Sequence, residues 1–214
     1  MYKDALKYLV VDGPIGVGKT VLAKRLATTF NTELMLENAL DNPFLPKFYE
    51  DPKSAALPTQ LHFLFQRLKM MEVLRQTDMF KPAQISDFLM QKDQLFAEVT
   101  LSDSEFELYN QVYSRLAMEA PIPDLVIYLQ APIDVLLKRI YQRNIAYEKR
   151  IEGTYLQKIS EAYINFFYYY NSSPTLIVNT TDINLVDSDS DYDYLLKYIR
   201  NLSPGKHYLN PQAL

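Results

Sequence analysis

One octapeptide limits the possible folds of this chain more than any other segment: Gly13-Pro14-Ile15-Gly16-Val17-Gly18-Lys19-Thr20. It matches the pattern G-x-x-x-x-G-K-[ST] in full, follows an apolar run at residues 6–12 and precedes an amphipathic helical pattern. A strand, a glycine-rich loop and a helix N-terminus in this order can cradle a polyphosphate with backbone N–H groups. In such a loop Lys19 reaches the β- and γ-phosphates, and the Thr20 hydroxyl ligates Mg²⁺. We therefore predict that this loop binds the phosphates of a nucleotide.

Along the rest of the chain, strand-length apolar runs alternate with longer helical patterns. Because these runs are apolar throughout rather than alternating with polar residues, they indicate strands that are covered on both faces. Strands that alternate with helices in sequence form a parallel, doubly wound sheet. We predict an α/β fold of the P-loop NTPase type, with a five-stranded parallel sheet flanked by helices. The expected strands are residues 6–12, 33–37, 83–88, 124–130 and 175–179.

Capping signals and helical periodicity place helices between these strands. The capping box formed by Ser102 and Glu105 predicts a helix that ends at about Met118. Further helices are expected over residues 133–143, after Pro132, and over residues 151–170. Two other helices should bury one apolar face each, formed by Val21, Leu22, Leu26, Ala27 and Phe30 and by Leu61, Leu64, Phe65, Leu68 and Met71.

Two segments near the C-terminus carry less information. We expect the Asp-rich residues 187–193 to form a solvated loop that leads into a C-terminal helix. Residues 203–214 are expected either to fray or to pack on a partner subunit, and the sequence does not decide between these two.

Length and composition indicate a single globular domain over residues 1–214. The chain has 22 Lys and Arg against 26 Asp and Glu, and this net charge of −4 argues against a nucleic-acid polymer or an anionic membrane as partner. It has no Cys and only 2 His, which excludes disulfides and thiol-ligated metals and argues against a Ser-His-Asp triad. Without a long apolar run or a signal-peptide pattern, we expect the protein to be cytoplasmic.

Missing motifs narrow the class of P-loop protein. A GTPase would need a D-x-x-G switch and an N-K-x-D guanine reader, and neither is found in position. A large motor ATPase needs a longer chain. Small-molecule kinases remain, because their acceptor pocket fits within about 200 residues.

Two groups of residues could form the acceptor side of such a kinase. Glu37 closes the second expected strand, and its carboxylate could take the proton of an attacking hydroxyl. The alternative is a helix-capping or solvated Glu. Gln60 and Arg67 share one helix face with Phe63 between them, and this amide, ring and guanidinium could read a base. The alternative is a partly buried polar seam.

Further candidates lie at the third strand and in the helix after the fourth. Asp87 stands at the carboxyl end of the third expected strand and could hold Mg²⁺, directly or through water, as the partner of Thr20. Arg139 and Arg143 are spaced i,i+4 and could belong to a loop that closes over the transferring phosphoryl group. The alternative for them is a solvated basic helix end, which the helix dipole favours.

Taken in order, these residues resemble the deoxynucleoside kinase family, in particular its bacterial deoxyadenosine/deoxyguanosine kinase branch. The likeness extends from about residue 9 to residue 198. It rests on GPIGVGKT, Glu37 with Asn42-Pro43-Phe44-Leu45 and Phe48-Tyr49, Gln60 with Arg67, Asp87 with Phe96-Ala97, the run 123–129, and Arg139-Ile140, Arg143, Glu148, Ile151 and Tyr155-Leu156.

The resemblance implies ATP-dependent phosphorylation of the 5′-hydroxyl of a deoxynucleoside, a purine one being favoured, in nucleotide salvage. It also implies Mg²⁺ as cofactor and a homodimer. By this analogy Glu37 is the general base, Gln60 pairs with the base and Arg67 sets the polar edge of the base pocket. Phe63 would lie near the base, Tyr49 and Glu148 would bind the sugar 3′-hydroxyl, and Arg139 and Arg143 would contact donor phosphates.

This sequence departs from the family pattern at two positions. Family members commonly carry Asp/Glu-Arg-Ser after the third strand, but here the triplet is Asp87-Phe88-Leu89. A further lid arginine is replaced by Ile145. These changes put base specificity and rate in question.

Two other functions therefore stay open. One is a nucleoside monophosphate kinase of the thymidylate kinase type, which would need more cations at the acceptor than Arg67 and Lys47. The other is a non-catalytic nucleotide-binding subunit, against which the presence of Lys19, Thr20, Glu37 and Asp87 argues.

Overall fold

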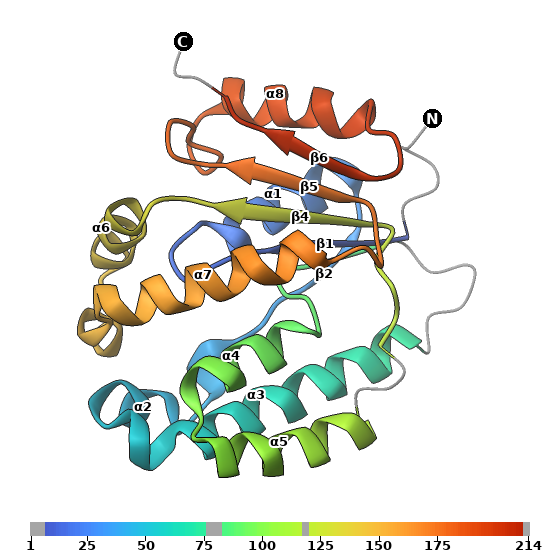
Figure 1. Cartoon of the computed structure of the whole chain (residues 1–214). Coiled ribbons are helices and arrows are strands. Elements are labelled where there is room, and N and C mark those ends of the chain that lie inside the picture. Colours follow the sequence, from blue (N-terminus) through green and yellow to red (C-terminus); the bar gives the residue numbers. More distant parts are fainter. Residues whose placement is uncertain (1–6, 76–82, 117–119, 212–214) are drawn as a thin grey trace.

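A computed structural model of the chain describes residues 7–75, 83–116 and 120–211. Within these residues the strands form one parallel sheet in the order β2-β3-β1-β4-β5-β6 (Figure 1). The strands are β1 (Tyr8–Asp12), β2 (Glu33–Met35), β3 (Gln84–Ser86), β4 (Leu125–Gln130), β5 (Thr175–Asn179) and β6 (Lys206–Leu209).

Helices connect the strands and cover both faces of the sheet. They are α1 (Lys19–Phe30), α2 (Leu45–Glu50), α3 (Pro52–Arg75), α4 (Lys92–Thr100), α5 (Asp103–Leu116), α6 (Ile133–Arg143), α7 (Gly153–Tyr169) and α8 (Asp189–Arg200). Two short 3₁₀ turns, η1 (Ala39–Asp41) and η2 (Tyr147–Arg150), lie in the connections. None of the helices in the described residues is long and apolar enough to span a membrane.

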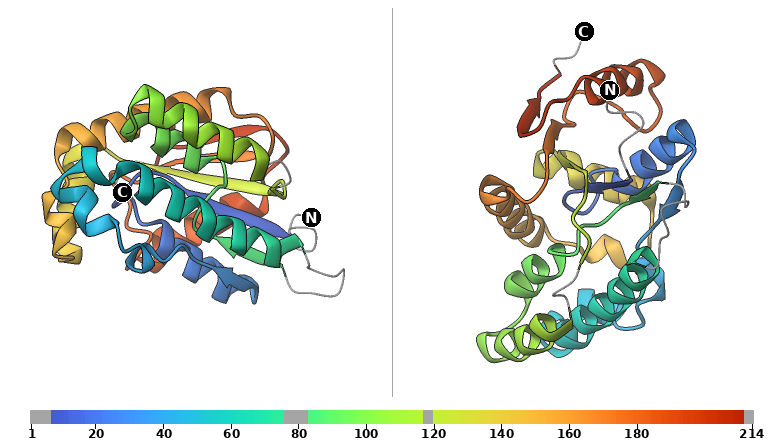
Figure 2. Two further views of the ribbon diagram at one scale, coloured as in Figure 1. Left: turned by 90° about the horizontal axis from the view of Figure 1, so that it is seen from below. Right: turned by 90° about the vertical axis from the view of Figure 1, so that its right-hand side faces the viewer.

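Alternate residues of the strands belong to two separate hydrophobic cores, because successive side chains of a strand point to opposite faces of the sheet. Leu9 and Val11 of β1 belong to a core with buried residues of α1 and α8. Val10, between them, belongs to a second core with α3, α4 and α7. Figures 1 and 2 show α2, α3, α4 and α5 grouped on the opposite side of the molecule from β6 and α8.

The five predicted strands are all present, but the sheet also has a sixth strand, β6. Residues 206–209 pair in parallel with β5, so this part of the tail is not frayed. The sequence Lys-His-Tyr-Leu of β6 is a weak strand signal, because Leu209 is the only one of these four residues that is buried. Pairing with the neighbouring strand therefore forms β6, and the local sequence does not signal it. Leu6, expected in the first strand, lies outside the described residues.

The helix predictions hold with three corrections. Residues 133–143 form α6 as expected. Ser102 directly precedes α5, and its backbone N–H is bonded to Glu105, while Met118 lies outside the described residues. Residues 187–193 are only partly a loop, because Ser188 caps α8 and acidic residues fill its first turn. The expected 151–170 helix begins later, at Gly153, after η2. Val21 and Phe65, expected on apolar faces, are 37% and 55% exposed.

Three strands end at one edge of the sheet and position the candidate site there. β1 leads directly into the glycine-rich loop, β2 ends two residues before Glu37, and β3 ends one residue before Asp87. In an open parallel sheet, ligands bind outside the carboxyl ends of the strands. The fold therefore brings the loop, Glu37 and Asp87 together.

Candidate active site

The glycines of the loop are required by its backbone path. Gly13 has φ +148°, and a Cβ on it would lie 2.3 Å from the carbonyl oxygen of Leu129 on β4. Gly18 has φ +104° and forms the N-cap of α1. An L-residue rarely adopts either conformation. The loop thus folds as a phosphate-binding turn whose helix begins at Lys19, with the first N–H groups of α1 directed at the site.

Lys19 lies across this loop. Its Nζ donates hydrogen bonds of 2.8 Å and 3.0 Å to the carbonyl oxygens of Gly13 and Pro14. Burial, together with the charge of the nearby Lys92 ammonium, lowers the pKa of Lys19 to about 8. A cation that is poorly solvated in this way is well suited to meet the charge of bound phosphates.

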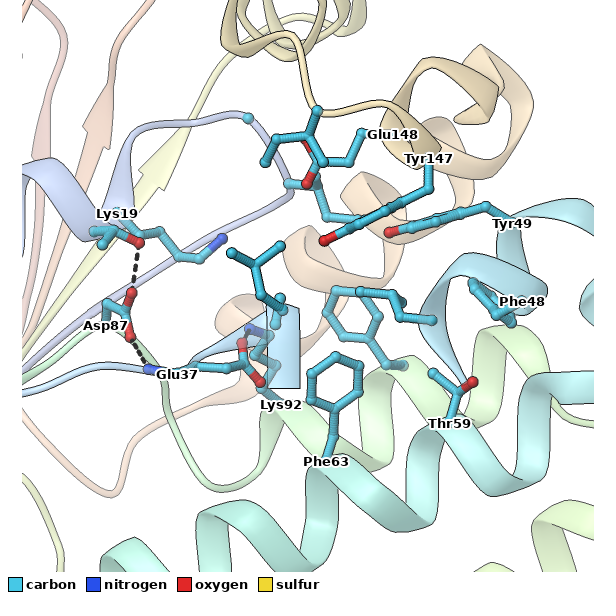
Figure 3. Close-up of a pocket in the computed structure, with 18 of the residues that line it drawn as sticks. Lys19, Glu37, Phe48, Tyr49, Thr59, Phe63, Asp87, Lys92, Tyr147 and Glu148 are labelled. Carbon is cyan, nitrogen blue, oxygen red and sulfur yellow. Dashed lines mark hydrogen bonds and ion pairs between the residues drawn. The ribbon is translucent and has the colours of Figure 1, made fainter. Parts of the chain in front are cut away.

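Asp87 joins the loop to the segment that carries Glu37. Its Oδ2 accepts a 2.5 Å hydrogen bond from the Thr20 hydroxyl, and its Oδ1 accepts one of 2.8 Å from the backbone N–H of Glu37 (Figure 3). Burial raises the pKa of Asp87, while these two hydrogen bonds oppose the rise.

This pair of oxygens fits Mg²⁺. A hydroxyl and a carboxylate are oxygen ligands of the kind that Mg²⁺ takes from proteins, with phosphates and water completing the shell. Within the described residues there is no group of three or more His, Cys, Asp or Glu that could hold a metal ion. With Thr20 and Asp87 as protein ligands, a metal here would take phosphate and water oxygens as its further ligands.

Glu37 is held by two cations, one on each carboxylate oxygen. Arg67 donates to Oε1, and Lys92 Nζ donates to Oε2 at 2.7 Å. The Glu37 side chain is only 12% exposed. Burial alone would raise the pKa of Glu37, but the charges of Arg67 and Lys92 outweigh burial and lower it to about 2. Glu37 is therefore a carboxylate at neutral pH.

Arg67 lies behind Glu37 and is fixed from several sides. Besides Glu37 it contacts the buried carboxylate of Asp93, and its guanidinium lies 5.3 Å from the ring centre of Phe63 and 5.7 Å from that of Phe88. Burial would lower the pKa of Arg67, but the two carboxylates raise it. Phe88, where the family pattern has arginine, thus forms part of the wall around Arg67.

One cavity brings the predicted acceptor residues together. It is lined by α2, α3, the start of α4 and the segment after α6, and it opens toward the phosphate loop (Figure 3). Gln60 is held there by a 3.1 Å hydrogen bond from its amide to the Thr100 hydroxyl. The predicted residues that line this cavity are Ile15, Gly16, Lys19, Thr20, Glu37, Tyr49, Gln60, Phe63, Arg67, Asp87, Arg143 and Glu148.

Residues from two distant segments pack against each other in the wall of the cavity. The rings of Tyr49 and Tyr147 stack with centroids 5.9 Å apart and an interplanar angle of 11°. Glu148, next to Tyr147, forms a 2.6 Å ion pair with Arg143. Burial raises the pKa of Glu148, and Arg143 opposes this. The segment after α6 is thereby attached to α2.

The two expected lid arginines occupy different surroundings. Arg143 lines the acceptor cavity, whereas Arg139 does not. Arg139 donates to the carbonyl oxygen of Thr180 at 2.7 Å and to that of Val17 at 3.4 Å. Both arginines border a second, more open pocket, together with the phosphate loop and residues 181–184. This pocket lies on the donor side of Lys19 and Thr20.

Sequence reasoning missed two charged residues at the start of α4, Lys92 and Asp93. Of the cations expected near the acceptor, Arg67 is there, but Lys47 is exposed and does not line the cavity. Lys92 takes that place instead. A signal was available, because the pair Lys92-Asp93 lies one residue before the apolar residues Leu95 and Phe96 in a segment that follows Asp87.

A phosphate loop that opens onto an acceptor pocket with a partly buried carboxylate defines a small P-loop kinase. The particular family follows from sequence comparison: the family model described as deoxynucleoside kinase matches residues 9–203, and the chain belongs to this family. The resemblance predicted from the sequence is confirmed, and the protein is an enzyme of the phosphotransferase class.

Named relatives and solved structures agree with this assignment. The chain is 34% identical over 202 residues to the deoxyguanosine kinase of Bacillus subtilis (strain 168), covering 91% of this chain and 97% of that protein. It is 27% identical over 204 residues to the deoxyadenosine/deoxycytidine kinase of the same strain, covering 91% and 92%. The structure of deoxyadenosine kinase from M. mycoides with bound dATP matches with a TM-score of 0.78 at 20% identity, over 91% of this chain and 100% of that chain, which supports the fold.

Proposed function

We propose that this enzyme transfers the γ-phosphoryl group of ATP to the 5′-hydroxyl of a purine deoxynucleoside, as a step of nucleotide salvage. The observation that carries the proposal is the position of Glu37. Its carboxylate lies in the acceptor cavity, and its own backbone N–H is bonded to Asp87, the partner of Thr20 in the phosphate loop. The names of the relatives at 34% and 27% identity support a deoxynucleoside acceptor and favour a purine.

The donor phosphates would lie on the loop of residues 13–20. Backbone N–H groups at the start of α1 and the Lys19 ammonium face them, and Arg143 borders both the donor pocket and the acceptor cavity. Arg139 would act on the donor side only. Thr20 and Asp87 would hold Mg²⁺, which when bound neutralises phosphate charge.

The acceptor would occupy the cavity between α2, α3 and α4. Gln60 and Phe63 would contact the base, the first with its amide and the second with its ring. Tyr49 and Glu148, which also line the cavity, would bind the sugar 3′-hydroxyl. The 5′-hydroxyl would then point toward Glu37 and the phosphate loop.

Glu37 would orient this hydroxyl and receive its proton. A carboxylate with a pKa of about 2 is a weak base, so its main contribution before transfer is to accept a hydrogen bond and align the oxygen for in-line attack. Phosphoryl transfer has a loose transition state, in which the attacking oxygen loses its proton as the new bond forms. A weak base is sufficient for that step.

The variant Glu37→Gln tests this role. The amide keeps the size of the side chain but removes the proton acceptor, so deoxynucleoside binding should persist while kcat falls about 10²- to 10⁴-fold. Glu98→Gln, on an exposed part of α4, is the matched control and should keep wild-type kcat. Near-wild-type turnover in Glu37→Gln would remove Glu37 from the proposed role.

A homodimer, implied by the family resemblance, is also part of this proposal. Tyr168 and Tyr169 at the end of α7 are 71% and 79% exposed, and Ile164 on the same helix is 54% exposed. These side chains give an apolar surface that a second copy would cover. Light scattering should report twice the mass of the chain, and a monomer mass would contradict the proposal.

A further inference from the structure

We propose that Lys92 is a catalytic residue of the transfer described above, and that its ammonium is shared between Glu37 and the phosphoryl group in transit. This inference rests on the proposed function and adds Lys92 to the site residues predicted from the sequence. Lys92 would also supply a cation at the acceptor end of the reaction, where the family pattern has an arginine and this chain has Phe88.

The position of Lys92 is the first argument. Its Nζ lies 2.7 Å from Oε2 of Glu37, and its side chain is 7% exposed and lines the acceptor cavity. An ammonium group has three N–H donors. In the described residues the hydrogen-bond acceptor of this group is Glu37, so donors are left to meet a ligand in the cavity.

The direction of Lys92 is the second argument. The Lys92 charge contributes to the lowered pKa of Lys19 and opposes the rise in the pKa of Asp87 that burial causes. Lys92 lines the same cavity as Lys19 and Asp87 and meets Glu37 there (Figure 3). A phosphoryl group that passes from the loop to a hydroxyl held by Glu37 must pass close to this ammonium.

Arg67, the other cation on Glu37, cannot fill the same role. It is bonded to Glu37 and to Asp93 and lies between the rings of Phe63 and Phe88. Its two carboxylates neutralise it and hold it in place. Of the two cations, Lys92 is the one that is paired with a single carboxylate, whereas Arg67 is paired with two.

Helix stability does not account for a lysine at this position. Lys92 is the first residue of α4, where the positive end of the helix dipole disfavours a cation. It is also buried, which costs free energy unless a partner compensates. The gain that explains its placement is the interaction with Glu37 and, in the complex, with phosphoryl oxygens.

In the proposed step Lys92 keeps its proton throughout. The 5′-oxygen forms a bond to the γ-phosphorus, the bond from this phosphorus to the β-bridging oxygen breaks, and ADP leaves with that electron pair. The hydroxyl proton passes to Glu37. The Lys92 ammonium stabilises negative charge on the phosphoryl oxygens and afterwards binds the phosphate of the product monophosphate.

Binding of the nucleoside and of its monophosphate gives the first test, because it does not depend on turnover. In Lys92→Met, calorimetry should show product monophosphate affinity at least about tenfold weaker, with deoxynucleoside affinity within about threefold of wild type. Equal losses for both ligands would indicate a structural role and overturn the proposal. If Lys92→Met does not fold, Lys92→Gln also removes the charge and is read in the same way.

A double-mutant cycle gives the second test. Lys92→Met should lower kcat about 10²- to 10³-fold. Lys92→Arg, which keeps the charge, should have a kcat at least about tenfold higher than that of Lys92→Met. The control Lys197→Met, on the exposed face of α8, should have wild-type kcat. In the Glu37→Gln background Lys92→Met should lower kcat by a further factor of about ten or more. If it has no added effect there, Lys92 acts only through Glu37 and the proposal fails. A wild-type enzyme that phosphorylates no deoxynucleoside would instead refute the proposed function.

Discussion

The hydroxyl of Thr20 donates a 2.5 Å hydrogen bond to Oδ2 of Asp87, and this contact ties the phosphate loop to the end of β3. The second oxygen of Asp87 accepts the backbone N–H of Glu37 at 2.8 Å. A single carboxylate thus fixes the distance between the loop that would hold the donor and the residue that would receive the acceptor proton. The donor and acceptor sides of the site are coupled through Asp87.

Replacing Asp87 by Asn should disturb both sides at once. An amide has one oxygen, so it can keep only one of the two hydrogen bonds that Asp87 accepts, and it is a poorer ligand for Mg²⁺. We expect kcat/KM to fall about 100-fold and the Mg²⁺ concentration for half-maximal rate to rise. Steady-state kinetics over a Mg²⁺ series measures both quantities. An unchanged Mg²⁺ dependence would show that Asp87 has no part in the metal site.

Arg67 should matter for folding as well as for activity. Arg67→Met leaves Glu37 without one of its cations and Asp93 as a buried carboxylate without its partner, which should cost about 3–5 kcal/mol in the free energy of unfolding. Adding Asp93→Asn removes the uncompensated charge and should restore part of this loss. Urea unfolding of both variants measures the effect. A double variant no more stable than Arg67→Met would contradict this account of the pair.

Two glycines with positive φ make a matched pair for testing the loop. In Gly13→Ala the new Cβ would clash with the Leu129 carbonyl oxygen on β4, whereas Gly205 has nothing within 4 Å of an added Cβ. Gly205→Ala should cost about 1–2 kcal/mol for backbone strain alone, and Gly13→Ala clearly more. Thermal unfolding of the two variants decides the point, and equal losses would mean that close approach to β4 is not what requires Gly13.

The low pKa of Glu37 predicts how stability depends on pH. Since this pKa is about 2 in the folded protein against an ordinary 4.5, the unfolded chain takes up the proton first as the pH falls. The stabilisation is therefore fully present above pH 4.5 and is lost toward pH 2, with a total of about 3 kcal/mol. Unfolding curves of nucleotide-free wild type and Glu37→Gln between these pH values should converge in acid, and parallel curves would disprove the shift.

The elements that the sequence predicted well are those whose signal is local. The phosphate loop follows from residue types at fixed spacing, and the meeting of Glu37 with Asp87 follows from the rule that parallel strands end at one edge of the sheet. Phe65 was misplaced because a helix face inferred from periodicity is wider than the stripe that becomes buried.

What the sequence did not predict depends on tertiary contacts. Lys92 and Asp93 reach Glu37 and Arg67 only because the residues after β3 turn α4 against α3, and no spacing rule encodes this turn. Arg139 and Arg143 likewise differ in their surroundings because Arg139 contacts Thr180 and Arg143 contacts Glu148, which come from other segments. β6 forms as a strand because it pairs with β5.

The most direct measurement is ADP release from MgATP with a panel of acceptors: deoxynucleosides, ribonucleosides and deoxynucleoside monophosphates. We predict turnover with deoxyguanosine or deoxyadenosine. Turnover with monophosphates alone would assign the protein to the monophosphate kinases, and ATP binding without turnover would make it a non-catalytic subunit. Either of these results would contradict the proposed reaction.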